Sequence, residues 1–106
     1  MSDFFQVLYD AGAELVLTGH DHGYQRFAPA DPSGAPDAAR GMRQFVVGSG
    51  GAALYAWKTD NSLIEVRDNM TYGVLRLELN AGGYAWEFMP VPGATAFTDS
   101  GAAACH

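Results

Sequence analysis

The alternation of hydrophobic and polar residues between positions 72 and 88 predicts a β-hairpin. In 72-YGVLRLEL-79 the leucines alternate with charged residues, and alternation resumes in 84-YAWEF-88. The residues between them, 80–83, are of the types that form tight turns. Because the side chains of a strand point alternately to its two faces, we expect one face of this hairpin to be buried and the other to meet water.

Near the N-terminus the apolar residues take the spacing of a helix instead. The residues that recur at this spacing are Phe4, Phe5, Leu8 and Tyr9. Ser2 is suited to cap the start of the helix and Gly12 to end it. Two β-prone runs follow at residues 14–18 and 44–47, and a helix before a buried strand is half of an α/β unit. In such units functional residues tend to lie just past the carboxyl end of the strand.

Glycine and proline mark the segments that we expect to be irregular. Residues 28–41 are rich in Ala, Pro, Asp and Gly, which predicts a surface loop. Residues 91–106 are rich in Pro, Gly and Ala, which predicts an irregular tail laid over a surface. The segment 48-GSGG-51 lacks the Lys and the following helix of a phosphate-binding loop, so it favours a turn that allows close backbone approach.

Composition and charge narrow the classes of function. The 106 residues, 48% hydrophobic and 17% charged, fit one globular unit. A net charge of −6 disfavours nucleic acid and anionic membranes as partners. No apolar run reaches the roughly 20 residues of a membrane span, and no signal peptide is recognisable at the start. The single cysteine, Cys105, allows no internal disulfide, so it is a free thiol or pairs outside this chain.

Two histidines follow the first predicted strand in 16-VLTGHDHGYQRFAP-29. In extended backbone, residues i and i+2 project to the same side about 6 to 7 Å apart, so His20 and His22 would face one site while Asp21 faces away. Gly19 and Gly23 remove side-chain bulk on both flanks. Such a pair can chelate one metal ion or give one nitrogen to each of two, although the spacing also arises without any metal.

The segment 19-GHDHGYQR-26 resembles the last metal motif of the calcineurin-like metallophosphoesterase family, in particular its purple acid phosphatase branch. Three further segments resemble the C-terminal end of exported bacterial members: 43-RQFVVGSGGAALY-55, 72-YGVLRLEL-79 and 97-FTDSGAAACH-106. The resemblance therefore covers nearly the whole chain. It implies an α/β (α+β) fold that forms the C-terminal part of an αββα sandwich, with one N-terminal helix and then mostly strands. It also implies that intact members are periplasmic or secreted.

The resemblance implies that His20 binds one metal of a dinuclear centre and His22 the other, with Fe, Zn or Mn as the metals and a phosphate ester as the substrate. Tyr24 would then be a pocket wall or, alternatively, a core residue. Arg26 would contact phosphate or form a salt bridge to a local acid such as Asp21. We expect His106, at a flexible end, to be inert.

The other ligand motifs of the family, Asp-x-His, Gly-Asp-x-x-Asp and Gly-Asn-His-Asp/Glu, do not occur in the sequence. We therefore expect a C-terminal segment whose missing N-terminal half supplies the remaining ligands. Two imidazoles cannot hold two divalent cations, so the isolated chain should be inactive and bind at most one ion weakly. Two alternatives remain open: a non-catalytic β-rich binding module and a cupin-like mononuclear metal protein, against which the predicted helix counts.

Overall fold

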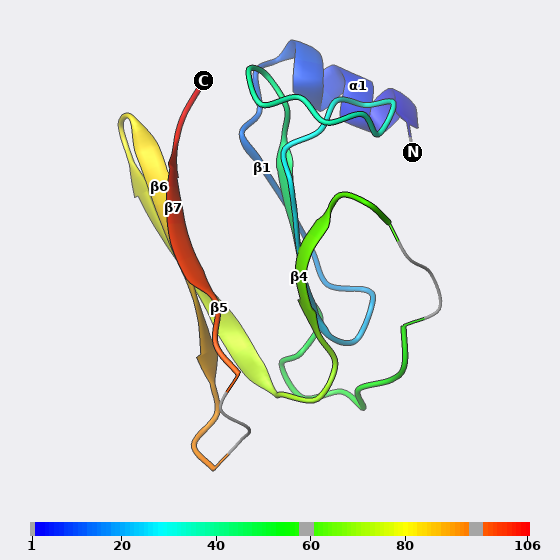
Figure 1. Ribbon diagram of the computed structural model, residues 1–106, viewed down its shortest axis with the longest axis vertical. Helices are drawn as coiled ribbons and strands as arrows, with labels where there is room; N and C mark the ends of the chain where they lie inside the picture. The colour runs from blue at the N-terminus through cyan, green and yellow to red at the C-terminus, as the bar shows by residue number, and fades with distance from the viewer. Residues whose placement is uncertain (1, 58–60, 94–96) are drawn as a thin grey trace.

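The computed structural model describes residues 2–57, 61–93 and 97–106, and within them it shows one helix and seven strands in two sheets (Figure 1). In chain order the elements are α1 (Ser2–Asp10), β1 (Leu15–Thr18), β2 (Tyr24–Phe27), β3 (Arg43–Val47), β4 (Ile64–Asp68), β5 (Gly73–Asn80), β6 (Gly83–Pro90) and β7 (Ser100–Ala104). The fold class is therefore α+β and mostly β, as the sequence predicts. No helix among these residues is long and apolar enough to cross a membrane.

The two sheets differ in the direction of their strands. The four-stranded sheet has the order β1-β3-β2-β4, in which β1 and β3 run parallel and the other neighbours run antiparallel. The three-stranded sheet has the order β5-β6-β7 and is antiparallel throughout. As a result, β1 and β5 are edge strands, each at one end of its sheet.

The core is a layer of aromatic rings between the two sheets. Tyr24 and Phe45 enter it from the four-stranded sheet, and β6 contributes every second residue, Tyr84, Trp86 and Phe88. Ring centroids are 4.8 Å apart for Tyr24 and Phe88 and 5.6 Å apart for Phe45 and Trp86. Aromatic pairs at such distances add to the burial of apolar area, so this layer is what holds the sheets face to face.

Helix α1 ends where the sequence predicts. The amide of Ala13 donates to the carbonyl of Leu8 and the amide of Gly12 to that of Tyr9, each at 3.0 Å, which is the hydrogen-bond pattern of a Schellman motif. Gly12 has a φ of 82°, a conformation that strains residues with a Cβ. The helix begins at Ser2, whose predicted capping side chain lies outside the described part of the structure.

All of the predicted strands are confirmed. The runs at 14–18 and 44–47 correspond to β1 and β3, and the hairpin is formed by β5 and β6. Residues 28–41 are irregular, as predicted, with an internal hydrogen bond from the amide of Asp37 to the carbonyl of Pro29 (3.0 Å) and a link from Tyr9 Oη to Asp37 Oδ2 (2.6 Å). Strands β2 and β4 were not predicted.

The predicted irregular tail over 91–106 is wrong for its last part. Ser100–Ala104 forms β7, which pairs with β6 along five residues from Gly83 to Glu87. The alanine-rich sequence has weak strand propensity, but its small residues allow close packing. A Cβ added at Gly101 would lie 2.4 Å from the ring of Trp86. Residues 94–96 of this segment lie outside the described residues.

The expectation that His106 lies at a flexible end is also wrong. Its backbone amide donates to Oε1 of Glu14 at 2.8 Å, and its Nδ1 lies 3.1 Å from the same oxygen. Its Nε2 lies 3.1 Å from the carbonyl oxygen of Gly41. The C-terminus is therefore tied to the residue that precedes β1.

Candidate functional site

The two histidines lie in a loop, residues 19–23, at the carboxyl end of β1. Because β1 and β3 are parallel, their carboxyl ends meet at the same edge of the sheet, and the loop lies against the end of β3. The amide of Gly48 donates to the carbonyl of Gly23 at 2.9 Å. A Cβ added at Gly48 would lie 1.9 Å from the carbonyl oxygen of Asp21. The predicted close backbone approach is thus confirmed at Gly48, where the partner is the histidine loop itself, but not at Gly50 or Gly51, where an added Cβ would meet nothing within 4 Å.

The backbone of the histidine loop is a bend, so the expectation of extended geometry for the histidine pair is wrong. The cause is the reversal of the chain between β1 and β2, which lie on either side of β3. His20 is exposed and His22 is half-buried. The same-side argument therefore does not apply, and the two imidazoles have different surroundings.

The imidazole of His22 is oriented by a backbone carbonyl. Its Nδ1 lies 2.7 Å from the carbonyl oxygen of Ala53. A carbonyl oxygen only accepts hydrogen bonds, so in the neutral imidazole Nδ1 carries the hydrogen and Nε2 keeps its lone pair. Histidines that bind metals commonly donate their other ring N–H to a carbonyl or carboxylate in this way.

The residues of the loop fit a share of a metal site, but they do not complete one. The described residues contain no group of three or more His, Cys, Asp and Glu side chains placed to hold a metal ion. The nearest carboxylate in sequence, Asp21, accepts a long hydrogen bond of 3.4 Å from Tyr55 Oη. His20 and His22 could thus supply two imidazole nitrogens, with the other ligands coming from elsewhere.

Tyr24 and Arg26 belong to a polar cluster centred on Asp99, and neither lies in the histidine loop. Tyr24 is fully buried and donates from its hydroxyl to Oδ2 of Asp99 at 2.7 Å, so it is a core residue. Arg26 donates from Nε to Oδ2 of Asp99 at 2.8 Å and from Nη2 to Oδ1 at 3.1 Å. Its Nη1 forms an ion pair with Glu65. The expected salt bridge of Arg26 therefore exists, but its partners are Asp99 and Glu65 and not Asp21.

The protonation states of Tyr24 and Asp99 favour a hydrogen bond that links the two sheets. Burial, together with the hydrogen bond to Asp99, raises the pKa of Tyr24 well above its usual 10.0. Burial acts to raise the pKa of Asp99 as well, but the hydrogen bonds from Arg26 and Tyr24 outweigh it and leave that pKa below its usual 3.8. At neutral pH the phenol is therefore neutral and the carboxylate is charged, which matches donor to acceptor.

Sequence reasoning missed the contacts made by residues 53–57. The ring of Tyr55 lies beside that of His22, with centroids 5.0 Å apart and an interplanar angle of 32°. The ring of Trp57 covers Gly23, where an added Cβ would lie 2.4 Å from it. The available signal was the apolar run 52-AALYAW-57 directly after the glycines, which has no periodicity of its own.

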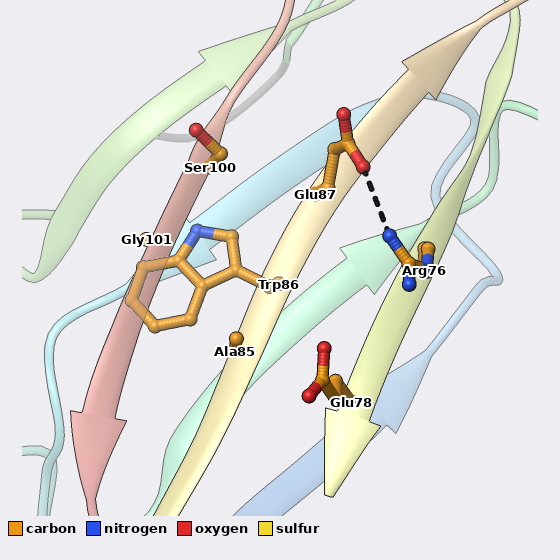
Figure 2. A pocket seen from close by; sticks show the side chains of 7 residues that line it. All are labelled: Arg76, Glu78, Ala85, Trp86, Glu87, Ser100 and Gly101. Carbon is orange, nitrogen blue, oxygen red and sulfur yellow. Dashed lines mark ion pairs between the residues drawn. The ribbon is translucent and has the colours of Figure 1, made fainter.

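Two hollows of similar size lie on the surface of the described residues. One, of about 380 Å³, opens between the edge strands β1 and β5 and is mostly apolar; it is lined by Leu17, Thr18, Gly19, Val47, Gly50, Gly73, Val74, Leu75 and Leu77. The other, of about 320 Å³, lies on the three-stranded sheet (Figure 2) and is lined by Arg76, Glu78, Ala85, Trp86, Glu87, Ser100 and Gly101. It contains no histidine, and its ion pair, Arg76 to Glu87 at 3.6 Å, is well exposed and so contributes little.

Comparisons with models of protein families, with curated proteins and with solved structures found no match to this chain. The case for a function therefore depends on the residues and geometry of the histidine loop.

Proposed function

We propose that this chain is the C-terminal segment of a metal-dependent phosphoesterase of the calcineurin-like type, with a fold that forms part of an αββα sandwich. In this proposal His20 and His22 each supply one imidazole to a dinuclear centre of Fe, Zn or Mn. The support comes from the motif Gly19–His20–Asp21–His22 and from its position at the carboxyl end of a parallel strand pair.

The observation that carries the proposal is the 2.7 Å contact between His22 Nδ1 and the carbonyl oxygen of Ala53. It fixes the tautomer in which Nε2 is free to bind a metal. Gly48 supports the same arrangement because it lets the backbone of the loop lie directly against the end of β3.

In an assembled centre His20 and His22 would hold the metal ions, which would activate water and neutralise charge on the phosphate ester. The role of this chain is to hold two imidazoles at one end of the sheet. In this proposal Arg26 has a structural role, because its guanidinium forms ion pairs with two carboxylates.

The missing strands of the sandwich would be added at the side of the fold where each sheet has an exposed edge strand. β1 and β5 are edge strands, and the apolar hollow of about 380 Å³ lies between them. Leu17 on β1 and Val74 on β5 are 55% and 58% exposed, more than a completed sandwich would leave open. In this proposal a missing N-terminal half covers them and brings the remaining ligands.

A non-catalytic β-rich binding module is the second candidate, with the mostly apolar hollow between β1 and β5 as its binding surface. A cupin-like protein fits less well. Cupins are double-sheet jelly rolls of antiparallel strands, whereas the four-stranded sheet here contains the parallel pair β1 and β3.

The test is calorimetric titration of the 106-residue chain with Zn²⁺ and with Mn²⁺ near neutral pH. We expect at most one ion to bind, weakly, and the double variant His20→Ala/His22→Ala to abolish binding. His106→Ala is the matched control, because His106 is held by Glu14 before β1, at the opposite end of that strand from the loop. Binding that persists in the double variant would refute the assignment of the ligands.

A phosphatase assay with p-nitrophenyl phosphate complements the titration. We expect no turnover by the chain alone. Metal-dependent turnover that disappears in the double variant would show that the chain, alone or as an oligomer, completes a site by itself, and the segment hypothesis would then be wrong. Equal binding affinity in the wild type and His106→Ala, with none in the double variant, would support the proposal.

A further inference from the structure

Two residues of one short segment contact the same imidazole. The carbonyl of Ala53 lies 2.7 Å from Nδ1 of His22, and two residues later the ring of Tyr55 lies beside the His22 ring at 5.0 Å between centroids. The first contact is directional and selects the tautomer, whereas the second limits rotation of the ring about its Cβ–Cγ bond. Together they restrain both the chemical state and the orientation of the imidazole.

Tyr55 is itself held in place from two sides. Asn69, in the turn between β4 and β5, donates from Nδ2 to the backbone carbonyl of Tyr55 at 3.1 Å. The hydroxyl of Tyr55 donates to Oδ1 of Asp21 at 3.4 Å. Two residues further on, the ring of Trp57 closes over Gly23, at the other end of the histidine loop. Residues 53–57 therefore contact the loop at His22, at Asp21 and at Gly23.

This pattern of contacts has a chemical consequence for metal binding. A free imidazole exchanges between two tautomers and rotates, so a metal ion must select one state and one orientation from several. A ring that is already restrained loses less conformational freedom when it binds, which raises affinity without any new contact to the metal. Tyr55 lies beside the ring and forms no part of the ligand set.

We propose that Tyr55 is a positioning residue that keeps the His22 ring against the carbonyl of Ala53, which selects the Nδ1–H tautomer and leaves Nε2 presented for coordination. This inference rests on the proposed function for its biological meaning, but the geometry of His22 can be measured without any metal. The aromatic ring of Tyr55 makes the contact that restrains His22, and its hydroxyl adds a weaker contact with Asp21.

The primary experiment is NMR of the metal-free chain labelled with ¹⁵N, using long-range ¹H–¹⁵N correlation to identify the tautomer of His22 at a mildly alkaline pH. In the wild type we expect a protonated Nδ1 and an unprotonated Nε2. In Tyr55→Leu we expect averaged ¹⁵N shifts of the two ring nitrogens that report a mixture of both tautomers. Tyr55→Phe keeps the ring and should keep the wild-type tautomer. Tyr72→Leu is the matched control, since Tyr72 is 36% exposed against 39% for Tyr55 and, within the described residues, its ring does not contact a histidine.

The second readout is Zn²⁺ affinity in the same variants. Loss of an outer-shell partner typically weakens metal binding by about 10- to 100-fold, so we expect a loss in this range for Tyr55→Leu and less than about 3-fold for Tyr55→Phe. A wild-type tautomer and unchanged affinity in Tyr55→Leu would overturn the inference. If His20→Ala/His22→Ala leaves Zn²⁺ binding intact, the proposed function fails, while the tautomer still decides the role of Tyr55.

Discussion

The hydroxyl of Tyr24 donates a hydrogen bond to Oδ2 of Asp99 at 2.7 Å, across 75 positions of sequence. Tyr24 begins β2 in one sheet, and Asp99 lies directly before β7 in the other. The bond therefore joins the two sheets through the aromatic core. Arg26 donates to both oxygens of the same carboxylate, so Asp99 accepts three hydrogen bonds, one from Tyr24 and two from Arg26.

We predict that Asp99→Asn lowers the free energy of unfolding by about 1–3 kcal/mol at neutral pH, because a charged acceptor is lost from Arg26. The pKa of Asp99 is below its usual 3.8 in the folded state, so its contribution is present above that pH and is lost as the pH falls further. The difference between wild type and variant should therefore shrink in acid. Urea denaturation at several pH values measures it.

Glu87→Gln is the control for this prediction. Its ion pair with Arg76 spans 3.6 Å, and the two side chains are 50% and 62% exposed. Exposed pairs contribute about 0–1 kcal/mol, so we expect a small effect. An equal loss of unfolding free energy in both variants would show that the hydrogen bonds of Asp99 stabilise the fold no more than an exposed ion pair does.

Tyr24→Phe should change how the free energy of unfolding depends on pH in the alkaline range. Burial and Asp99 hold the pKa of Tyr24 far above 10.0, so the folded state keeps the phenol neutral while the unfolded chain ionises. Stability due to this group is full below pH 10.0 and falls as the pH rises beyond it. We expect the variant to lose about 1 kcal/mol near neutral pH and to show a shallower alkaline decline than the wild type. A parallel decline in both proteins would contradict the assignment.

Gly48→Ala should displace the histidine loop. The new Cβ would lie 1.9 Å from the carbonyl oxygen of Asp21. The clash is with backbone atoms, so it cannot be relieved by a change of side-chain rotamer. We expect a loss of about 3 kcal/mol, at the upper end for overpacking, together with shifted NMR signals from His22. Gly50→Ala is the control, since a Cβ there meets no atom within 4 Å. Similar effects of the two substitutions would show that the contact at Gly48 is unimportant.

Gly101→Ala tests the unexpected strand β7. An added Cβ would lie 2.4 Å from the ring of Trp86, so the strand must shift away from β6 or the indole must move. We expect a loss of about 1–3 kcal/mol and faster hydrogen exchange at the amides of Ser100–Ala104. In Gly82→Ala, where a Cβ meets nothing within 4 Å, exchange in β7 should stay as in the wild type. Unchanged protection in Gly101→Ala would argue that the packing is looser than described.

The open edges of β1 and β5 predict self-association of the chain at high concentration. Edge strands present unpaired N–H and C=O groups, and Leu17 on β1 is 55% exposed beside the apolar hollow. Leu17→Lys should reduce association measured by sedimentation velocity. Met70→Lys, at a side chain 74% exposed in a turn outside the hollow, should not. A monomeric wild type at high concentration would refute this prediction.

Much of the fold followed from local patterns. The end of α1 just before Gly12, the strands β1 and β3 and the hairpin of β5 and β6 were all predicted, because helical spacing, alternation and glycine act within a few residues. Strand β2 was not, since Tyr24, Gln25, Arg26 and Phe27 mix aromatic and polar residues without alternation. All of its pairing is with β3 and β4, which follow it in the chain.

The sequence by itself determined that two histidines follow the first strand, and that glycines surround them. Only the tertiary structure decided what those histidines contact. The carbonyl of Ala53 lies 31 residues from His22 along the chain, and it reaches the ring because Gly48 brings the end of β3 against the loop. The same holds for Arg26, whose carboxylate partners Asp99 and Glu65 come from distant segments. Contacts of this kind depend on how the sheets pack, and a local pattern carries no information about them.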